Sequence, residues 1–218
     1  MPTVAIVDDH LLLAETLRTA LESSGVRAWI VPPASLDDLA EQLGAAPVDL
    51  VLLDLDLGAY SSNSTPMIGS LASLGIRVLV VTGSLDRLLI ASALEQGAIG
   101  VQPKAAGFVE LVRNTRAALT ATGPLHPEQR AQLLGELHRA RATRERELSP
   151  FLALTAREAQ TLRALTAGHA VTEIAAQWVV SEATVRSHVR GILAKLGVSS
   201  QLAAVAAAAN SGWLSEAN

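Results

Sequence analysis

The stretch from Val48 to Gly58, V-D-L-V-L-L-D-L-D-L-G, decides the fold. Its Leu and Val residues run on without polar alternation, which is typical of a strand buried on both faces of a sheet. The apolar run ends at Asp54 and Asp56. In an open α/β sheet, ligands bind at the carboxyl ends of strands, so Asp54 lies where a reactive carboxylate would act. The alternative at this point is an aspartate that only starts a loop, since Asp commonly follows a strand.

The first half of the chain repeats this pattern of strand and helix. Strands are predicted at Thr3–Val7, Val26–Val31, Val48–Leu53, Ile76–Val81 and Ile99–Gln102. Helices are predicted at His10–Ser23, after a cap at Ser35, near Pro66–Leu74, at Asp86–Gln96 and at Phe108–Ala121. Strands that alternate with helices in this way predict an α/β fold with a doubly wound, five-stranded parallel sheet.

The pattern breaks at Thr122-Gly123-Pro124. Residues Glu128–Glu147 are charged and prone to form a helix, and we interpret them as a helical linker that ends at Ser149-Pro150. The few apolar anchors of this linker are Leu133, Leu134 and Leu137. The remaining helices are predicted at Ala156–Ala167, Val171–Trp178, Glu182–Leu196 and Gln201–Ser211. The predicted domains are therefore residues 1–121, a linker at 122–150, and a small all-α domain at 151–218.

Charge differs between the two halves of the chain. Residues 1–121 carry 7 Lys and Arg against 13 Asp and Glu, whereas residues 122–218 carry 10 against 8. An acidic first part and a mildly basic second part indicate two domains with different partners. The chain has no cysteine, which excludes disulfides and thiolate metal sites. Without a secretory signal or an apolar run of roughly 18 residues, we expect a soluble cytoplasmic protein and no membrane partner.

Five polar residues are expected to meet at one edge of the sheet. Asp8 and Asp9 follow the first strand, Asp54 ends the third, Thr82 ends the fourth and Lys104 follows the fifth. All five thus lie at carboxyl ends of strands, near the point where the strand order reverses. Three converging carboxylates need a cation, and oxygen ligands with room for water suit Mg²⁺. A lysine and a hydroxyl group opposite them suit a phosphoryl group.

The second half contains a helix, a three-residue turn and another helix over residues 171–196, the pattern of a helix-turn-helix. Ser181 is placed to cap the second helix. Ser187 points away from the apolar stripe of this helix, Arg190 lies nearby, and Arg186 and Lys195 flank the stripe. The stripe consists of Val185, Val189, Ile192, Leu193 and Leu196. Such a helix can bury one face and place the other in the major groove of DNA, although a solvated face on a small helical bundle is the alternative.

The first 121 residues resemble the receiver domain of two-component response regulators, which has a flavodoxin-like fold. The resemblance rests on V-D-D (7–9), L-L-D-L-D (52–56), V-V-T-G (80–83) and G-V-Q-P-K (100–104), in this order. It implies that Asp54 accepts a phosphoryl group and that Thr82 and Lys104 bind its oxygens. It also implies a Mg²⁺ site made by Asp8, Asp9, Asp54 and the backbone carbonyl of Asp56. Receivers usually carry Tyr or Phe on the fifth strand where this chain has Val101, and a proline after the lysine, whereas Pro103 precedes Lys104.

Residues from about Leu152 to Leu214 resemble the LuxR-type DNA-binding domain. The resemblance rests on L-T-A-R-E (154–158), T-E-I-A (172–175), S-E-A-T-V-R-S-H-V (181–189) and K-L-G-V (195–198). It implies that Arg186, Ser187 and Arg190 contact base edges or phosphates and that Thr184 and Lys195 hold the DNA backbone. It further implies that the Ala-rich last helix forms a dimer contact.

Together the two resemblances give the layout of the NarL/FixJ class of response regulators. We therefore expect a transcriptional regulator that is phosphorylated on Asp54 by a partner histidine kinase and binds double-stranded DNA, as a homodimer at least when phosphorylated. No enzyme activity beyond its own phosphorylation and dephosphorylation is expected. A DNA-binding regulator that works without phosphorylation is the alternative, and Val101 is its best support. A phosphatase similar to the haloacid dehalogenases, suggested by D-L-D-L-G (54–58), is disfavoured because the Asp8-Asp9 pair comes first.

Overall fold

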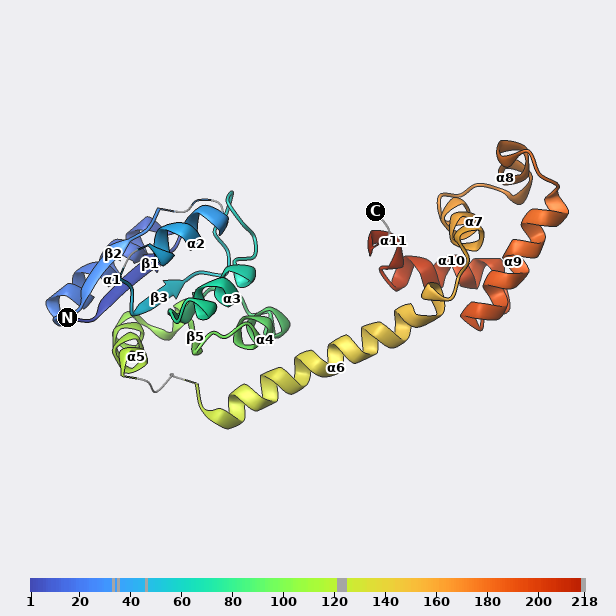
Figure 1. Ribbon diagram of the computed structural model, residues 1–218. Coiled ribbons are helices and arrows are strands. Elements are labelled where there is room, and N and C mark those ends of the chain that lie inside the picture. Colours follow the sequence, from blue (N-terminus) through green and yellow to red (C-terminus); the bar gives the residue numbers. More distant parts are fainter. Residues whose placement is uncertain (33, 35, 46, 121–124, 217–218) are drawn as a thin grey trace. The chain divides into compact units, whose positions relative to one another are not determined.

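The computed structural model describes residues 1–216 except 33, 35, 46 and 121–124 (Figure 1). The predicted cap at Ser35 and the break at residues 122–124 lie outside the described residues. The chain divides into two compact units, Met1–His138 and Arg139–Asn218.

The first unit contains a parallel sheet with the strand order β2-β1-β3-β4-β5, which confirms the predicted fold class (Figure 1). Its strands are β1 (Thr3–Val7), β2 (Arg27–Ile30), β3 (Leu50–Leu53), β4 (Arg77–Thr82) and β5 (Gly100–Pro103). Its helices are α1 (Leu11–Ser23), α2 (Leu36–Gly44), α3 (Thr65–Ser73), α4 (Arg87–Glu95) and α5 (Phe108–Leu119), with a short 3₁₀ helix at Lys104–Ala106.

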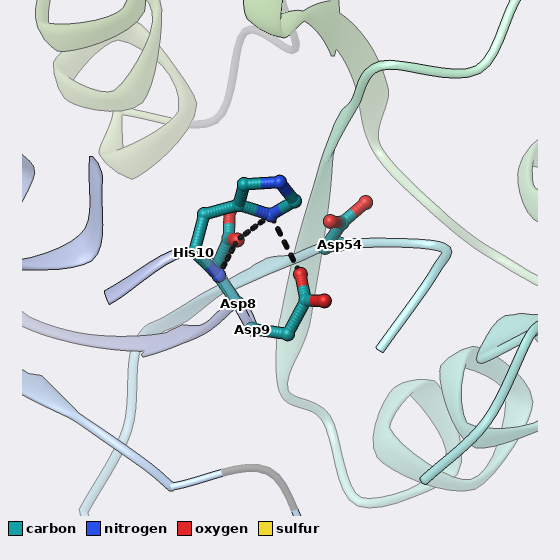
Figure 2. Close-up of side chains that lie close together, drawn as sticks. All are labelled: Asp8, Asp9, His10 and Asp54. Atoms are coloured by element: carbon teal, nitrogen blue, oxygen red, sulfur yellow. Dashed lines mark hydrogen bonds and ion pairs between the residues drawn. The ribbon is translucent and has the colours of Figure 1, made fainter. Parts of the chain in front are cut away.

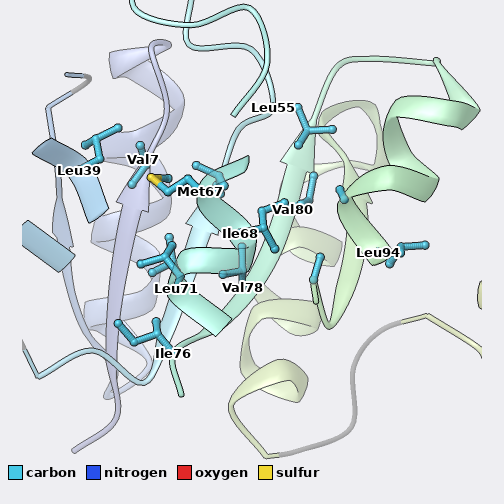
Figure 3. Packing of buried hydrophobic residues seen from close by; sticks show 14 of the residues in the cluster. Val7, Leu39, Leu55, Met67, Ile68, Leu71, Ile76, Val78, Val80 and Leu94 are labelled. Atoms are coloured by element: carbon cyan, nitrogen blue, oxygen red, sulfur yellow. The ribbon is translucent and has the colours of Figure 1, made fainter. Parts of the chain in front are cut away.

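Alternate residues of each strand pack into two hydrophobic cores, one on each face of the sheet. The central strand β3 shows this division: Val51 and Leu53 face one core, while Leu50 and Leu52 face the other. Helices α2, α3 and α4 cover the first face, where Met67, Ile68 and Leu71 of α3 pack against the strands (Figure 3). Helices α1 and α5 cover the second. Because all four residues of β3 are buried, the absence of polar alternation in its sequence is explained.

The predicted linker forms a helix with different limits from those expected. Helix α6 runs from Pro127 to Leu152 without ending at Ser149-Pro150, so the predicted end of the helix is wrong. Pro150 lies in its last turn, where the missing N–H removes a single hydrogen bond and the helix continues for two more residues. The boundary between the two units falls inside this helix, after His138.

The second unit is entirely helical. Beyond the end of α6 it contains α7 (Ala156–Thr166), α8 (Val171–Trp178), α9 (Glu182–Leu196), α10 (Gln201–Asn210) and the short α11 (Trp213–Glu216). The core includes Phe151, which stacks on Trp213 with ring centroids 5.3 Å apart. In the part of the chain that the structure describes, no single helix is long and apolar enough to cross a membrane; α9 and α10, bent by 58°, reach that length and composition only as a pair.

Candidate functional site

The polar residues predicted at the sheet edge do converge there. Asp8 follows β1, Asp54 follows β3, Thr82 ends β4 and Lys104 follows β5. The backbone N–H of Asp54 donates to the carbonyl of Val7 at 2.9 Å, which holds the ends of β1 and β3 together. Asp8, Asp54 and Thr82 are 5%, 3% and 2% exposed. The parallel topology thus places two carboxylates and a hydroxyl group, distant in sequence, in one buried cluster.

Lys104 is the cation of this cluster. Its Nζ lies 2.6 Å from Asp54 Oδ2 and 2.8 Å from Asp8 Oδ2, and its side chain is 16% exposed. Burial by itself would lower the pKa of Lys104, but the hydrogen bonds and negative charges of Asp54 and Asp8 raise it above its ordinary value. Lys104 is therefore held charged beside the carboxylate that is predicted to react.

Burial raises the pKa of Asp54 above its ordinary value, and the neighbouring Asp8 carboxylate adds to this effect. Lys104 opposes it by a hydrogen bond and by its charge but does not cancel it. An added cation would favour the ionised form of Asp54 by the same electrostatic rule. A bound metal ion would thus stabilise the ionised form of the Asp54 carboxylate.

The carboxylates and one histidine could hold that ion. Figure 2 shows Asp8, Asp9, His10 and Asp54 close together, and one ligand atom from each lies within 4.8 Å of the others. His10 Nδ1 is 2.6 Å from Asp9 Oδ1. Carboxylate oxygens are the ligands that Mg²⁺ prefers, so the donor set fits the predicted ion. Sequence reasoning missed His10, and its place directly after Asp8-Asp9 was the available signal.

The loop after Asp54 is shaped around the same cluster. Ser64 Oγ donates to the backbone carbonyl of Asp54 at 2.5 Å, and Asp56 N–H donates to Asp54 Oδ1 at 3.3 Å. At Gly58, φ is +60°, and a Cβ atom there would lie 2.9 Å from Asp9 Oδ2. The positive φ therefore favours glycine at this turn, which lies directly against the Asp9 carboxylate.

A cavity opens beside Asp54. It measures about 410 Å³ and is lined by His10, Asp54, Asp56, Thr82, Gly83, Ser84 and Lys104. Thr82 Oγ1 accepts a hydrogen bond from the N–H of Ser84 at 3.0 Å, which leaves its own proton for another acceptor. The cavity thus offers a carboxylate, a cation and a hydroxyl group, an arrangement suited to a tetrahedral dianion.

The second unit presents the predicted helix-turn-helix. Helix α8 ends at Trp178, and the next residue, Val179, caps it with φ 54° and ψ 47°. The Ser181 side chain caps α9 by accepting from Thr184 N–H at 3.1 Å, as predicted. Val185 and Ile192 of the apolar stripe are buried, while Arg186 and Arg190 are exposed. Figure 1 shows α8 and α9 joined by this turn.

The exposed side of α9 carries most of the residues predicted to meet DNA. Thr184, Arg186, Ser187 and Arg190 are all exposed. Arg186 Nη2 pairs with Glu182 Oε2 at 3.0 Å, a solvent-exposed contact that another anion can replace. Arg186 and Arg190 line a groove of about 480 Å³ together with Gln201 at the start of α10, a residue that the sequence reasoning did not single out.

Lys195 lies in a different environment. Its Nζ is 2.6 Å from Oε2 of Glu158, and the two side chains are 33% and 11% exposed. Burial would raise the pKa of Glu158, but hydrogen bonds from Lys195 and Thr155 lower it below its ordinary value. Lys195 therefore ties α9 to α7, and its contact with the DNA backbone stays a prediction.

Two family models match the chain. Residues 4–116 match the response regulator receiver domain, and residues 152–208 match the luxR family of bacterial regulatory proteins. The chain is 30% identical to the probable transcriptional regulatory protein NarL of Mycobacterium tuberculosis, over 94% of this chain and 92% of that protein. It is 32% identical to the nitrate/nitrite response regulator protein NarP of Escherichia coli, over 92% and 91%.

A solved structure shares the fold. The structure of RcsB from Salmonella enterica serovar Typhimurium, bound to promoter rprA in the presence of phosphomimetic BeF₃⁻, superposes with a TM-score of 0.51 at 21% identity. The match covers 95% of this chain and 98% of that one.

Proposed function

The chain belongs to the NarL/FixJ class of response regulators, which join a receiver domain to a LuxR-type DNA-binding domain, and on that basis we propose that phosphorylation of Asp54 by a partner histidine kinase controls DNA binding by α9. The observation that carries the proposal is the Asp54 carboxylate, which is buried, paired with Lys104 and open to a cavity. Residues 1–121 act as the receiver, 122–150 as the connection and 151–218 as the DNA-binding domain.

The reaction uses groups already in place. An Asp54 oxygen attacks the phosphorus of phosphohistidine, the P–N bond breaks, and its electron pair leaves with the histidine of the kinase. Lys104 and the Thr82 hydroxyl bind the oxygens of the transferred phosphoryl group. Asp8, Asp9 and Asp54, with the carbonyl of Asp56, would hold Mg²⁺, which when bound neutralises negative charge on the phosphoryl oxygens.

The protein acts on DNA through a pair of α9 helices, one from each copy of the chain. Arg186, Ser187 and Arg190 contact base edges or phosphates in the major groove, and Thr184 and Lys195 hold the backbone. Two copies of the chain bind two half-sites as a homodimer. The proposed dimer contact on α10 is supported by an exposed apolar strip at helical spacing, formed by Leu202, Ala206 and Ala209.

A regulator that does not use phosphorylation is the second candidate. It is favoured by Val101, which stands where similar receivers carry an aromatic residue. The phosphatase reading has less support, because the family matches and the order of the acidic motifs both favour a regulator.

A phosphotransfer assay tests the proposal. Wild type and Asp54→Asn are incubated with a small phosphoryl donor and Mg²⁺, and the label on the protein is measured by intact mass. Asp37→Asn is the matched control, because the Asp37 side chain is exposed on α2 and does not line the cavity. We expect label on wild type and on the control, and none on Asp54→Asn. Equal labelling of all three proteins would remove Asp54 from the mechanism, and repeated turnover of a phosphate ester would favour a phosphatase.

A further inference from the structure

The first part of α6 is built into the core of the receiver. Leu133 and Leu137 are 8% and 6% exposed and belong to the hydrophobic cluster that also contains Ala91 and Leu94 of α4. Leu125 and Leu134 pack against the same cluster. A connection that only spanned two domains would leave these leucines in water. Residues 127–138 are thus a docked element of the first unit, on the face of α4 and β5.

Polar contacts fix the docked helix at both ends of α4. Arg87, the first residue of α4, makes a bidentate pair with Glu136, with N···O distances of 2.8 Å from both Nε and Nη2. Arg130 donates to the carbonyl of Leu94 at 2.7 Å and to the carbonyl of Ala98 at 2.9 Å. These carbonyls lie at and after the C-terminal end of α4, where backbone acceptors lack helical partners and a cation is favoured.

The Arg87–Glu136 pair, called the clamp below, is connected to the cavity beside Asp54 by a short chain of hydrogen bonds. Thr82 Oγ1 accepts from the N–H of Ser84 at 3.0 Å, and Ser84 Oγ accepts from the N–H of Asp86 at 3.1 Å. Asp86 caps α4 by accepting from the N–H groups of its first turn. Arg87 is the next residue. The hydroxyl group assigned to the phosphoryl oxygens is therefore connected to Glu136 through Ser84, Asp86 and Arg87.

The docked helix also lies over Val101. A cavity of about 490 Å³ is lined by Val101 of β5, Ile90 of α4, and Leu125 and Leu133 of the α6 region, among others. Val101 and the docked helix therefore line the same space on this face.

We propose that residues 127–138 are the element by which the receiver reports phosphorylation: docked on α4 and β5 while Asp54 is unmodified, and released from this face when Asp54 is phosphorylated. The inference rests on the proposed function. A phosphoryl oxygen on Asp54 draws the Thr82 hydroxyl toward it, which removes the acceptor from Ser84 N–H and displaces the cap of α4. The Arg87–Glu136 pair is bidentate and begins at the first residue of α4, so a shift of the cap moves one of its two partners. While docked, the helix also keeps other proteins from this face.

Hydrogen exchange of the full chain, with and without beryllium fluoride and Mg²⁺, tests the inference. Beryllium fluoride serves as a mimic of the phosphoryl group. In wild type we expect amides of residues 127–138 to exchange at least about tenfold faster when it is bound, because the released helix loses the packing that stabilises its backbone hydrogen bonds. In Asp54→Asn the rate should not respond. Arg87→Ala should exchange fast without the mimic, and Arg113→Ala, which removes an exposed pair within α5, should behave as wild type.

The outcomes separate the two proposals. Protection of the peptides around Asp54 and Thr82 reports that beryllium fluoride is bound. If these peptides and the DNA affinity respond while residues 127–138 do not, the inference is overturned and the proposed function stands. If neither the pocket nor the DNA affinity responds, both are overturned. Slow exchange of residues 127–138 in Arg87→Ala, equal to that of Arg113→Ala, would contradict the role of the clamp.

Discussion

The two functional regions of this chain are built in opposite ways. The cavity beside Asp54 is buried and acidic, and it joins residues as distant as Asp8 and Lys104, which are 96 positions apart. The exposed side of α9 carries Arg186, Ser187 and Arg190 within five consecutive positions. In a buried cluster, one added charge changes the energy of every neighbour, whereas exposed charges on a helix are screened by solvent. The first region is therefore suited to sensing, and the second to binding.

The largest expected effect comes from breaking the buried charge cluster. Lys104→Ala leaves the Asp8 and Asp54 carboxylates together without their cation, and breaking such a pair typically reduces stability by about 3–5 kcal/mol. Urea unfolding of the first unit at neutral pH measures this loss, and added Mg²⁺ should restore part of it. Arg113→Ala, which removes an exposed pair, is the control and should change stability by less than about 0.5 kcal/mol. Equal losses in both variants would contradict a buried cluster held by Lys104.

A substitution on the exposed side of α9 is expected to weaken DNA binding and to leave the stability of the protein unchanged. Arg190→Ala removes an exposed cation, so DNA affinity should fall by about 10- to 100-fold, in line with 1–3 kcal/mol per base contact. The unfolding midpoint should stay that of wild type. Fluorescence anisotropy over a series of salt concentrations separates the two possible contacts. A smaller salt slope indicates a phosphate contact, and an unchanged slope with altered sequence preference indicates a base contact.

Lys195 is the residue of α9 for which an effect on stability and an effect on DNA binding can be told apart. Because it pairs with Glu158, Lys195→Ala should reduce the stability of the second unit by about 1–2 kcal/mol, less than a fully buried pair. Glu158→Gln should reproduce most of this loss, and the double variant should show coupling between the two positions. If Lys195→Ala instead lowers the salt slope of DNA binding and leaves the unfolding midpoint unchanged, Lys195 is a DNA contact and its pairing with Glu158 contributes little.

The smallest expected effect is a gain in stability at the turn between α8 and α9. Val179 is 90% exposed and adopts a left-handed conformation, which disfavours a β-branched side chain by about 1–2 kcal/mol. Val179→Gly should therefore raise the melting temperature of the second unit. Val180→Gly, one position further on and outside this conformation, should not raise it. A decrease in both variants would mean that the Val179 side chain makes a contact that outweighs its strain.

The sequence predicted the parts of the molecule that follow from a repeating pattern. Asp8, Asp54, Thr82 and Lys104 were expected to meet because strands of a parallel sheet end on the same side, and the structure brings them together. The apolar stripe and the cap of α9 were expected from helical spacing and from Ser181, and both are present.

What the sequence did not predict depends on contacts between distant segments. Residues 128–147 have the charge of a solvated linker. Leu133 and Leu137 were expected as its apolar anchors, but the receiver core that they complete was not. The pairing of Lys195 with Glu158 joins residues 37 positions apart and gives a predicted DNA contact a partner within its own domain. His10 was missed because its contacts with Asp8, Asp9 and Lys104 depend on the conformation of the chain between β1 and α1.

The central claim is that the buried carboxylate governs the exposed helix, and DNA affinity at fixed salt measures this directly. Anisotropy with a labelled duplex compares wild type, Asp54→Asn and Asp37→Asn, each with and without beryllium fluoride and Mg²⁺. The account predicts that affinity rises at least about tenfold, a change of roughly 1.4 kcal/mol, in wild type and Asp37→Asn and does not change in Asp54→Asn. The same affinity for all three proteins under both conditions would contradict it.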